Sequence, residues 1–322
     1  MPDTPIQDLP LDPTVAWVFP GQGAQHVGMG ADLADQSVTA RAMFTAADEA
    51  LGLSLSQLCF EGPEDELTRT VNTQPAIVTH SVAALATAIE AGAITSRPAF
   101  VAGHSLGEYA ALIAAGAVGF DDGVRLVRER GRLMQEACDT EPGTMAAILG
   151  LDPAALQPIC DEHAASICNI NAPGNITIGG TVAAVEAASV GASLAGATRV
   201  VTLTVSGAFH TPLMAAAAEG LRGALTGVAF ADPRTPVVSN VTAMPMTGAS
   251  DFAVELVNQV TKPVLWADSV AAMQAAGVTS LIEFGPGRVL SGLARRIDRS
   301  LATRNIGTVD DLGPQRSAEV SS

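Results

Sequence analysis

The fold is decided by the stretch Val101-Ala102-Gly103-His104-Ser105-Leu106-Gly107-Glu108-Tyr109, which runs on into Ala110-Ala111-Leu112-Ile113-Ala114-Ala115. The apolar residues before Gly103 indicate the end of a buried strand, and the alanine- and leucine-rich run indicates a helix. Gly103-x-Ser105-x-Gly107 therefore falls on a strand-to-helix turn, which is the pattern of a nucleophile elbow. Its glycines let the backbone turn sharply, so we expect an exposed Ser105 hydroxyl beside the first N–H groups of the helix. An ordinary glycine turn is the alternative, because the pattern alone is short.

Length and composition indicate a large α/β protein. The chain has 322 residues, enough for one large domain with an insertion, and it is 48% hydrophobic but only 4% aromatic. Side chains of this kind are typical of helices packed on a parallel sheet. No apolar run has the length of a membrane span, and residues 1–8 lack the charged and apolar regions of a signal peptide. We therefore expect a cytoplasmic protein that does not enter a membrane.

The charge balance argues against nucleic acid as a partner, because 33 acidic residues stand against 17 basic ones and give a net charge of -16. The cysteines show no C-x-x-C spacing and lie in apolar surroundings. We therefore expect reduced core residues, with neither a disulfide framework nor a metal site. These cysteines are Cys59, Cys138, Cys160 and Cys168.

Basic residues gather in two short stretches. The first holds Arg125, Arg128, Arg130 and Arg132, and the second holds Arg288, Arg295, Arg296 and Arg299. In an acidic protein such patches recruit an anionic ligand or partner, or they lie on solvated helix faces. The sequence leaves both interpretations open for the second stretch.

Arg130 differs from its neighbours because it lies within an apolar stripe. A helix is expected from Asp121, and Arg130 stands three or four residues from several of its apolar positions. An unpaired buried cation costs several kcal/mol, so either an internal carboxylate or a substrate carboxylate is expected beside it. The helix after Ser105 rises about 20 Å and the return to Arg130 falls about 14 Å, at 1.5 Å per residue. An antiparallel pair would bring Arg130 back beside Ser105, which favours the substrate.

Residues 142–204 have a pattern of their own, of order β-α-β-β-α-β, which is the ferredoxin-like unit. Strands are expected at 144–149, 166–170, 175–179 and 198–204, and helices at 152–163 and 182–194. We therefore expect a small domain inserted at 142–204 into a large domain made of residues 1–141 and 205–322.

Among the histidines, His210 is the best candidate for a general base, because it lies in a loop between the last inserted strand and a helix. His80 falls in an apolar helical run, where a buried structural histidine is expected. His163 falls on a solvent-facing helix. The His104 side chain is expected to point away from that of Ser105, its neighbour in the elbow.

The remaining elements complete the large domain. A first strand is expected at 15–19 after a loose lead-in over residues 1–13, with the glycine-rich turn Pro20-Gly21-Gln22-Gly23 after it. Helices are expected at 32–51 and 74–91, the latter capped by Asn72 or Thr73. Further strands are expected at 236–240 and 280–284, and residues 310–322 are polar and expected to be disordered.

Taken together, the motifs resemble the malonyl-CoA:acyl carrier protein transacylase family, which includes the acyltransferase domains of polyketide synthases. The resemblance covers nearly the whole chain and has one departure, Asn175, where the family commonly has glutamine. Its motifs are Phe19-Pro20-Gly21-Gln22-Gly23, Gly103 to Tyr109, Arg130-Gly131-x-x-Met134-Gln135, Asn169-x-Asn171-x-Pro173-Gly174, Phe209-His210 and Gly285-Pro286-Gly287. It implies an α/β-hydrolase-like large domain with a parallel sheet and an inserted ferredoxin-like small domain.

The resemblance also implies roles for single residues. Ser105 would be the nucleophile and His210 the base of a Ser–His dyad, with the backbone carbonyl of Gln259 orienting the imidazole. The backbone N–H groups of Gln22 and Leu106 would form the oxyanion hole. The acyl group would be bound by Arg130, which holds the malonyl carboxylate, and by Gln22, Asn171, Phe209 and Met134, with Asn169 as a further candidate beside Asn171.

The implied reaction moves malonyl from coenzyme A to the phosphopantetheine thiol of an acyl carrier protein for fatty acid synthesis, through an acyl-serine. We expect a monomer that needs no cofactor, with carrier-protein docking on Arg288, Arg295, Arg296 and Arg299. A discrete polyketide synthase acyltransferase shares every motif and stays open. A serine hydrolase or thioesterase is more distant, because Asp139, Asp152 and Asp161 lie between serine and histidine outside any motif. A catalytically silent binding protein is disfavoured by the intact Ser105, Arg130 and His210.

Overall fold

The computed structural model describes residues 6–313 and contains two separate sheets. The larger sheet has six strands in the order β10-β9-β1-β2-β7-β8, and only β7 and β8 pair antiparallel. Its strands are β1 (Leu11–Phe19), β2 (Arg97–Gly103), β7 (Val237–Val238), β8 (Pro245–Met246), β9 (Ser280–Phe284) and β10 (Ala302–Ile306). The parallel strands β1, β2, β9 and β10 are the framework on which the elbow turn is built.

Alternating side chains of β1 enter two different cores. Trp17 and Phe19 pack on one face of the large sheet, whereas Ala16 and Val18 pack on the other. All four are fully buried, as expected for a strand covered on both faces. The large sheet is therefore the middle layer of a three-layer structure.

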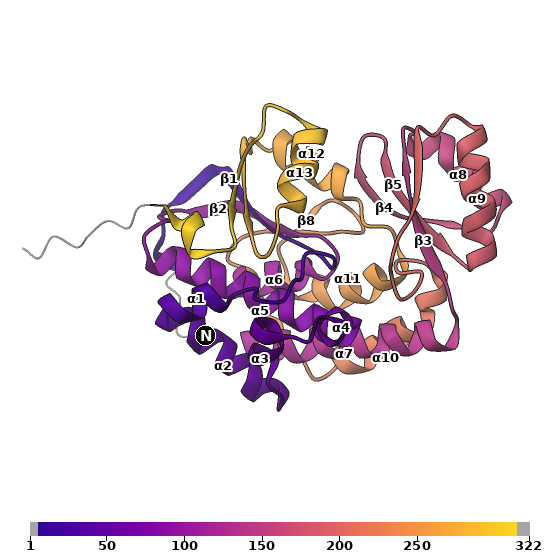
Figure 1. Ribbon diagram of the computed structural model, residues 1–322. Coiled ribbons are helices and arrows are strands. Elements are labelled where there is room, and N and C mark those ends of the chain that lie inside the picture. Colours follow the sequence, from indigo (N-terminus) through magenta and orange to yellow (C-terminus); the bar gives the residue numbers. More distant parts are fainter. Residues whose placement is uncertain (1–5, 314–322) are drawn as a thin grey trace, which may run out of the picture.

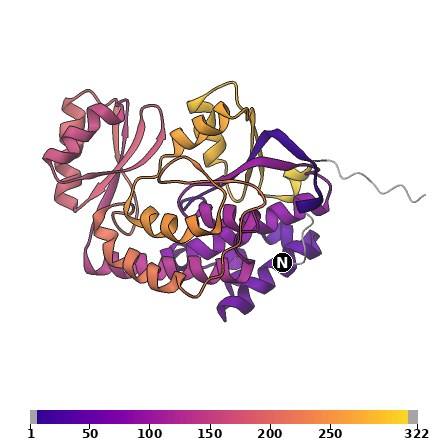
Figure 2. The ribbon, with the colours of Figure 1, turned by 180° about the vertical axis from the view of Figure 1, so that it is seen from behind.

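The layer on the Trp17 face contains most of the helices, seen below the sheet in Figure 1. It consists of α1 (Ala31–Gln36), α2 (Val38–Leu51), α3 (Leu55–Glu61), α4 (Glu64–Thr68), α5 (Thr70–Glu90), α6 (Gly107–Ala114), α7 (Phe120–Thr140), α10 (Ala215–Leu225) and α11 (Ala249–Thr261). The view from behind shows α10 and α11, in orange, at the back of this layer (Figure 2). The layer on the Ala16 face consists of α12 (Trp266–Ala275) and α13 (Val289–Ile297).

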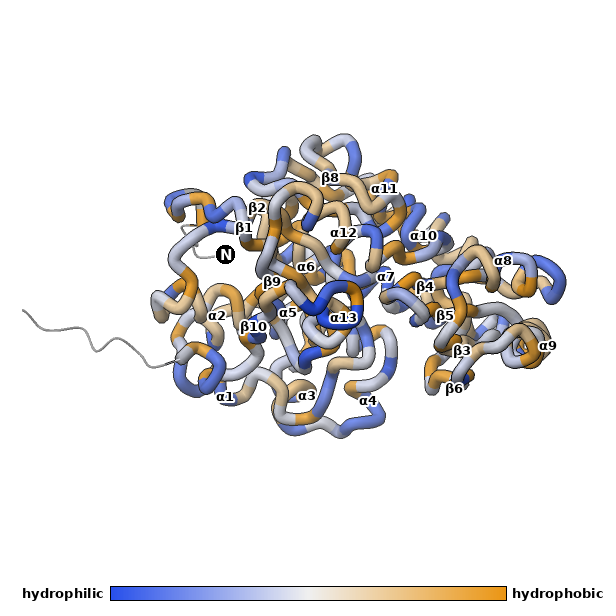
Figure 3. Tube along the Cα trace, turned by 90° about the horizontal axis from the view of Figure 1, so that it is seen from above, coloured by the Kyte–Doolittle hydropathy of each residue, from blue (hydrophilic) through white to orange (hydrophobic). Residues whose placement is uncertain are grey.

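The second sheet is entirely antiparallel, with the order β4-β5-β3-β6. Its elements follow the chain as β3 (Thr144–Leu149), α8 (Pro153–Glu162), β4 (Ser166–Ala172), β5 (Asn175–Gly180), α9 (Val182–Leu194) and β6 (Arg199–Thr202). Helices α8 and α9 cover the face that points away from the rest of the molecule, and the unit projects to one side when it is seen from above (Figures 1 and 3). The predicted fold class is confirmed, whereas the domain limits at 142 and 204 stay a prediction.

One strand of the small sheet is hydrogen-bonded to the large unit. The backbone N–H of Ile170 in β4 donates to the carbonyl of Val264 at 2.9 Å, and the N–H of Val264 donates to the carbonyl of Cys168 at 2.8 Å. Val264 lies between α11 and α12. These bonds fix the small sheet beside the loop that joins the C-terminal end of α11 to α12.

Several predicted boundaries were wrong. The helix expected at 32–51 is divided at Ser37, which takes an extended conformation and accepts a bond from the N–H of Ala40 as the cap of α2. Helix α5 begins at Thr70, so Asn72 and Thr73 lie inside it and are not caps. The first strand begins within the supposed lead-in, because Leu11 already pairs with Arg97 of β2.

Three short 3-10 helices complete the description, η1 (Ile6–Asp8), η2 (Pro212–Met214) and η3 (Val309–Leu312). A capping box between Thr308 and Asp311 starts η3 and Gly313 ends it, so the expectation of disorder from residue 310 was wrong for 310–313. The rest of that expectation, residues 314–322, lies outside the described residues. Among the helices described, none combines the length and the hydropathy that a bilayer crossing requires.

Candidate active site

Ser105 sits on a strained turn between β2 and α6. Its φ is 51°, a left-handed value that residues with a side chain rarely adopt. The turn tolerates only glycine at its two ends, because a Cβ at Gly103 would overlap the backbone of Gly107, and one at Gly107 would overlap the carbonyl of Phe19. The elbow predicted from the sequence is therefore present, and both of its glycines are required by close backbone approach.

Asn240 holds the elbow from the end of β7. Its Oδ1 accepts a hydrogen bond from the N–H of Ser105 at 2.7 Å, and its Nδ2 donates to the carbonyl of Gly103 at 2.7 Å. The side chain is buried, so these bonds are shielded from water. No local pattern marks this residue, which lies 135 positions from Ser105.

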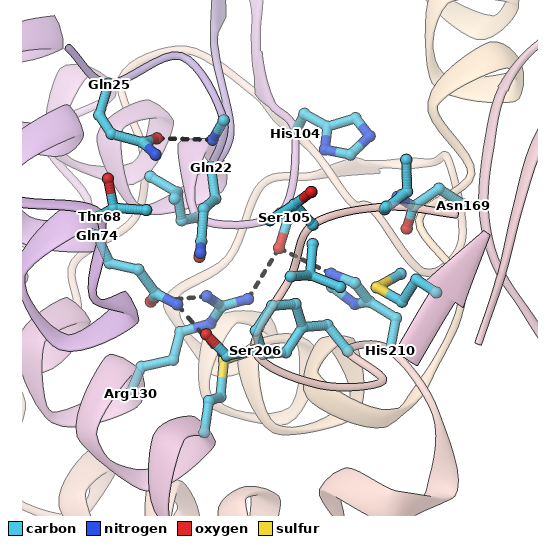
Figure 4. Close-up of a pocket in the computed structure, with 18 residues that line it drawn as sticks. Gln22, Gln25, Thr68, Gln74, His104, Ser105, Arg130, Asn169, Ser206 and His210 are labelled. Carbon is cyan, nitrogen blue, oxygen red and sulfur yellow. Dashed lines mark hydrogen bonds between the residues drawn. The ribbon is translucent and has the colours of Figure 1, made fainter. Parts of the chain in front are cut away.

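His210 is hydrogen-bonded to Ser105. The Nε2 atom lies 2.8 Å from the serine Oγ (Figure 4). The Nδ1 atom lies 2.7 Å from the backbone carbonyl of Gln259. A carbonyl only accepts, so Nδ1 carries the proton and Nε2 is left to accept from the serine hydroxyl. Burial, with the Arg130 charge as the next cause, lowers the pKa of His210 to about 3. The ring is therefore neutral at neutral pH and able to take a proton.

Arg130 is buried beside the serine, with 1% of its surface exposed. Nη2 donates to the Oγ of Ser105 at 2.9 Å and to the Oε1 of Gln259 at 2.9 Å, while Nη1 donates to the Oε1 of Gln74 at 2.8 Å. The guanidinium also lies 5.6 Å from the centre of the Tyr109 ring. No ion pair to Arg130 is present among residues 6–313, so the internal salt bridge left open by the sequence is not found there.

A cavity of about 420 Å³ opens onto these groups. It lies between the two units, and Asn169 of β4 and Met145 of β3 line it from the small sheet. Of the residues predicted to contact the acyl group, the cavity is lined by Gln22, Arg130, Met134 and Phe209. Leu106 lines it as well, and within residues 6–313 the backbone N–H groups of Gln22 and Leu106 donate no hydrogen bond. Two unused donors of this kind are what an oxyanion requires.

Asn171 does not lie where it was predicted. It is absent from the cavity lining, because its Oδ1 lies 2.9 Å from Nε2 of His104 and its Nδ2 donates to the hydroxyl of Thr177 at 3.3 Å. The neighbouring candidate, Asn169, lines the cavity instead. Figure 4 shows the His104 ring directed away from Ser105 and toward the small sheet.

The four arginines predicted for docking lie on the surface around α13. Arg288 precedes the helix and pairs with Asp311 at 3.4 Å, and Nε of Arg295 donates to the hydroxyl of Thr303 at 3.2 Å. Arg296 and Arg299 are also exposed. None of the four lines the cavity.

Two buried side chains near the site were not predicted to act there. Gln74 of α5 bonds Arg130, and Glu108 of α6 accepts hydrogen bonds from Asn240 and from the Gln259 side chain. Glu108 lies within the elbow motif, so its position in the sequence was a signal, but its partners come from distant segments. Within the described range, no group of three or more His, Cys, Asp or Glu side chains is arranged to hold a metal. All four cysteines are buried and unpaired, as expected.

The sequence matches known proteins over most of its length. Residues 16–306 match the family model of the acyl transferase domain. The chain is 47% identical over 294 residues to the malonyl CoA-acyl carrier protein transacylase of Bacillus subtilis, with 90% of this chain and 92% of that protein covered. The protein of the same name from Escherichia coli K12 is 45% identical over 286 residues, with 88% and 92% covered.

Solved structures agree over similar lengths. An acyl carrier protein S-malonyltransferase from Vibrio cholerae has a TM-score of 0.90 at 41% identity, with 93% of this chain and 98% of that chain covered. The malonyl-transacylase in a complex with a type II PKS acyl-carrier protein has a TM-score of 0.89, also at 41% identity, with 92% and 97% covered. Similarity of this extent between whole chains reaches both units of the fold.

Proposed function

Since this chain belongs to the malonyl-CoA:acyl carrier protein transacylases of the acyl transferase family, we propose that it moves malonyl from coenzyme A to the phosphopantetheine thiol of an acyl carrier protein. One observation carries the proposal. The Ser105 Oγ lies between a neutral histidine and a buried guanidinium that has no carboxylate partner among the described residues. A hydroxyl so placed is activated by one neighbour while the other selects an anionic acyl group.

In the first half-reaction His210 acts as the base. Nε2 takes the hydroxyl proton as the Ser105 Oγ forms a bond to the thioester carbonyl carbon. The backbone N–H groups of Gln22 and Leu106 stabilise the oxyanion, at a typical value of about 3 kcal/mol for one such donor. The C–S bond then breaks, and the imidazolium returns its proton to the sulfur of coenzyme A. Malonyl is left as an ester on Ser105.

Arg130 binds the free carboxylate of malonyl. Before substrate binds, the guanidinium donates a hydrogen bond to Ser105. When the malonyl carboxylate enters, it accepts hydrogen bonds from part of the guanidinium N–H groups. Gln74 and Gln259 hold the remaining N–H groups in a fixed direction. Met134 and Phe209 supply apolar walls of the cavity for the carbons between the two polar ends.

The second half-reaction runs in the opposite direction with a different thiol. Nε2 of His210 takes the proton of the phosphopantetheine thiol, the sulfur forms a bond to the ester carbonyl carbon, and the serine oxygen leaves with that proton. The same N–H groups meet the second oxyanion. Because coenzyme A leaves before the carrier protein reacts, ping-pong kinetics are expected. The carrier protein is proposed to dock on Arg288, Arg295, Arg296 and Arg299.

The serine hydrolase alternative is disfavoured by the partner of His210. A hydrolase triad places a carboxylate on Nδ1 of the histidine, whereas here Nδ1 faces the backbone carbonyl of Gln259. Fatty acid synthesis is proposed as the pathway, because the curated relatives carry the name malonyl CoA-acyl carrier protein transacylase. The complex with a type II PKS acyl-carrier protein keeps a discrete polyketide acyltransferase as the second candidate.

Mass spectrometry of the acyl-enzyme tests the proposal. Incubation with malonyl-CoA is expected to add one malonyl group to the peptide that contains Ser105, and a purified carrier protein bearing phosphopantetheine is expected to remove it. Ser105→Ala supplies the control and is expected to take no label. An unmodified serine peptide in the wild type, or a label that only water removes, would overturn the proposal. Carrier proteins from fatty acid and polyketide systems, compared as acceptors, separate the two pathways.

A further inference from the structure

Glu108 is a buried carboxylate that the transfer steps do not use. It lies in the first turn of α6, three residues after Ser105, and is fully buried. Its Oε1 accepts a hydrogen bond from the backbone N–H of Asn240 at 3.1 Å, and its Oε2 accepts one from Nε2 of Gln259. Both oxygens thus face donors, and an ionised carboxylate, which only accepts, satisfies both.

Charged groups surround Glu108 from three elements. Burial raises the pKa of its carboxyl well above the ordinary value, with Glu255 of α11 acting in the same direction, while the two N–H donors and Arg130 of α7 lower it. Tyr109, its neighbour on α6, has a pKa that burial raises above the usual range, so its phenol is neutral. Arg130 is thus the cation that balances Glu108.

Gln259 stands between Glu108 and Arg130. Its Nε2 donates to Glu108 and to the carbonyl of Ser105 at 3.0 Å, and its Oε1 accepts from Nη2 of Arg130 at 2.9 Å. Since a carboxylate only accepts and a guanidinium only donates, the amide has a single orientation that satisfies both neighbours. The backbone carbonyl of the same residue holds His210.

This arrangement balances the charge of Arg130 without filling the hydrogen-bonding positions of its guanidinium. A carboxylate bonded directly to the guanidinium would form the paired hydrogen bonds that an incoming carboxylate needs. With an amide between the two charges, the buried cation keeps a counter-charge nearby, and the amide oxygen uses only one of its N–H groups. The guanidinium is therefore stabilised in the fold and still open to an anionic ligand.

We propose that Glu108 is a positioning residue for acyl-group selection, which fixes the Gln259 amide and, through it, the direction and charge balance of Arg130. The inference rests on the proposed function, because it takes the ligand of Arg130 to be the carboxylate of the acyl group. Glu108 touches neither the acyl group nor Ser105 Oγ in this account, and it acts only through Gln259 and Asn240.

Glu108→Gln is the first test, because it keeps the shape and replaces one acceptor with a donor. The new amide has two orientations. In one, its NH₂ group faces the backbone N–H of Asn240. In the other, its NH₂ group faces the side chain of Gln259, which must then turn and present its own NH₂ group to Arg130. We expect kcat/KM for malonyl-CoA to fall about 30-fold, mainly through KM, and that for acetyl-CoA to change less than about 3-fold. Equal losses for both donors, or no loss, would contradict the inference.

Glu255→Gln is the matched control. Glu255 is also a mostly buried carboxylate near the site, but its Oε1 accepts from the backbone N–H of Val241 at 3.0 Å. It makes no hydrogen bond to Gln259 or Arg130 within the described residues. The ratio of malonyl to acetyl transfer is expected to stay within about 2-fold of the wild type, which is a free-energy difference of about 0.4 kcal/mol. A change as large as that of Glu108→Gln would show a general effect of removing buried charge.

The double variant Glu108→Gln with Gln259→Glu covers the case in which the single variant does not fold. It keeps the net charge and the pairing of donors with acceptors between positions 108 and 259 and toward Arg130, although the hydrogen bond to the carbonyl of Ser105 is lost. It places the carboxylate directly on Arg130. We expect a folded protein that has lost its preference for malonyl over acetyl, and a retained preference would overturn the inference. Malonyl labelling of Ser105 in the wild type is read first, so failure of the proposed function is seen separately.

Discussion

Arg130 donates a hydrogen bond from Nη2 to the hydroxyl oxygen of Ser105 across 2.9 Å. The residue that we propose to select the acyl group therefore touches the residue that we propose to carry it. The contact also means that a positive charge faces the serine oxygen before any substrate enters, which favours loss of the hydroxyl proton. In the proposed mechanism, selection of the donor and activation of the nucleophile are therefore coupled through one guanidinium.

Removing that guanidinium should shift the preference between acyl donors from malonyl-CoA toward acetyl-CoA. In Arg130→Ala the malonyl carboxylate would enter a buried site without its partner, so kcat/KM for malonyl-CoA should fall about 100-fold or more. Acetyl-CoA, which has no carboxylate, should gain activity relative to malonyl-CoA. Initial rates with both donors measure the ratio, and an unchanged ratio would refute the assigned role of Arg130.

The acylation rate should fall less at acid pH than it would if the base were an exposed histidine. Burial, followed by the Arg130 charge, lowers the pKa of His210 to about 3 from the ordinary 6.5, so the ring stays neutral and basic well below pH 6. Rapid-quench measurement of Ser105 malonylation from pH 7.5 to 5 should show a change of less than about 3-fold, after correction for any unfolded protein. A fall of about 10-fold per pH unit below 6.5 would show instead that the base titrates normally.

The elbow glycines give a prediction with a control in the same chain. In Gly107→Ala the new methyl group would overlap the carbonyl of Phe19, so the soluble folded yield or the melting temperature should fall sharply. Gly223 of α10 has nothing within 4 Å of the position that its Cβ would take. Gly223→Ala should therefore raise the stability by about 0.5–1 kcal/mol, because alanine favours a helix over glycine. Urea unfolding of both variants measures the difference, and similar losses would contradict the steric argument.

The central residues of the proposed site could be predicted because each stands in a local pattern. Ser105 follows from the glycine spacing, and the position of Arg130 follows from a cation in an apolar stripe on a helix that returns to the elbow. The side chains that hold them could not be predicted, although the resemblance implied the backbone carbonyl of Gln259. Asn240 and Gln259 reach the site from segments more than 100 positions away, and no periodicity marks a polar residue that is buried only because the fold brings partners to it.

The wrong boundaries have local physical causes. Ser37 ends one helix and caps the next within what is a continuous amphipathic pattern, and its hydroxyl is hydrogen-bonded to Ala40 of α2 and to Thr87 and Glu90 of α5. Asn171 was expected in the cavity because it shares a motif with Asn169, but successive polar positions along β4 have different partners. His104 takes the Oδ1 of Asn171 and removes it from the cavity lining.

A second buried histidine should contribute to acid unfolding. Burial lowers the pKa of His80 to about 4, although Nε2 of His80 donates to the carbonyl of Gly307 at 2.7 Å. Below pH 6.5 the unfolded chain binds a proton that the folded chain excludes, so stability falls as pH falls from 6.5 toward 4. His80 alone should cost about 2 kcal/mol between pH 7 and 5. In urea unfolding, the free energy of unfolding of His80→Gln should fall by about 2 kcal/mol less than that of the wild type between pH 7 and 5. An equal fall in both proteins would contradict the buried neutral state of His80.

Charge reversal on α13 should separate binding of the carrier protein from binding of the acyl donor. Arg295 and Arg296 lie in the last turn of the helix and are exposed, and neither lines the cavity where malonyl reacts. Attraction between exposed charges of opposite sign mainly affects association, so Arg295→Glu with Arg296→Glu should raise KM for an acidic carrier protein about 10-fold. KM for malonyl-CoA in the acylation half-reaction should stay unchanged. Arg222→Glu on α10 with Arg41→Glu on α2 reverses two other exposed arginines and so matches the change in net charge, which makes it the control. If that control raises KM for the carrier protein equally, the effect belongs to overall charge and the docking surface lies elsewhere.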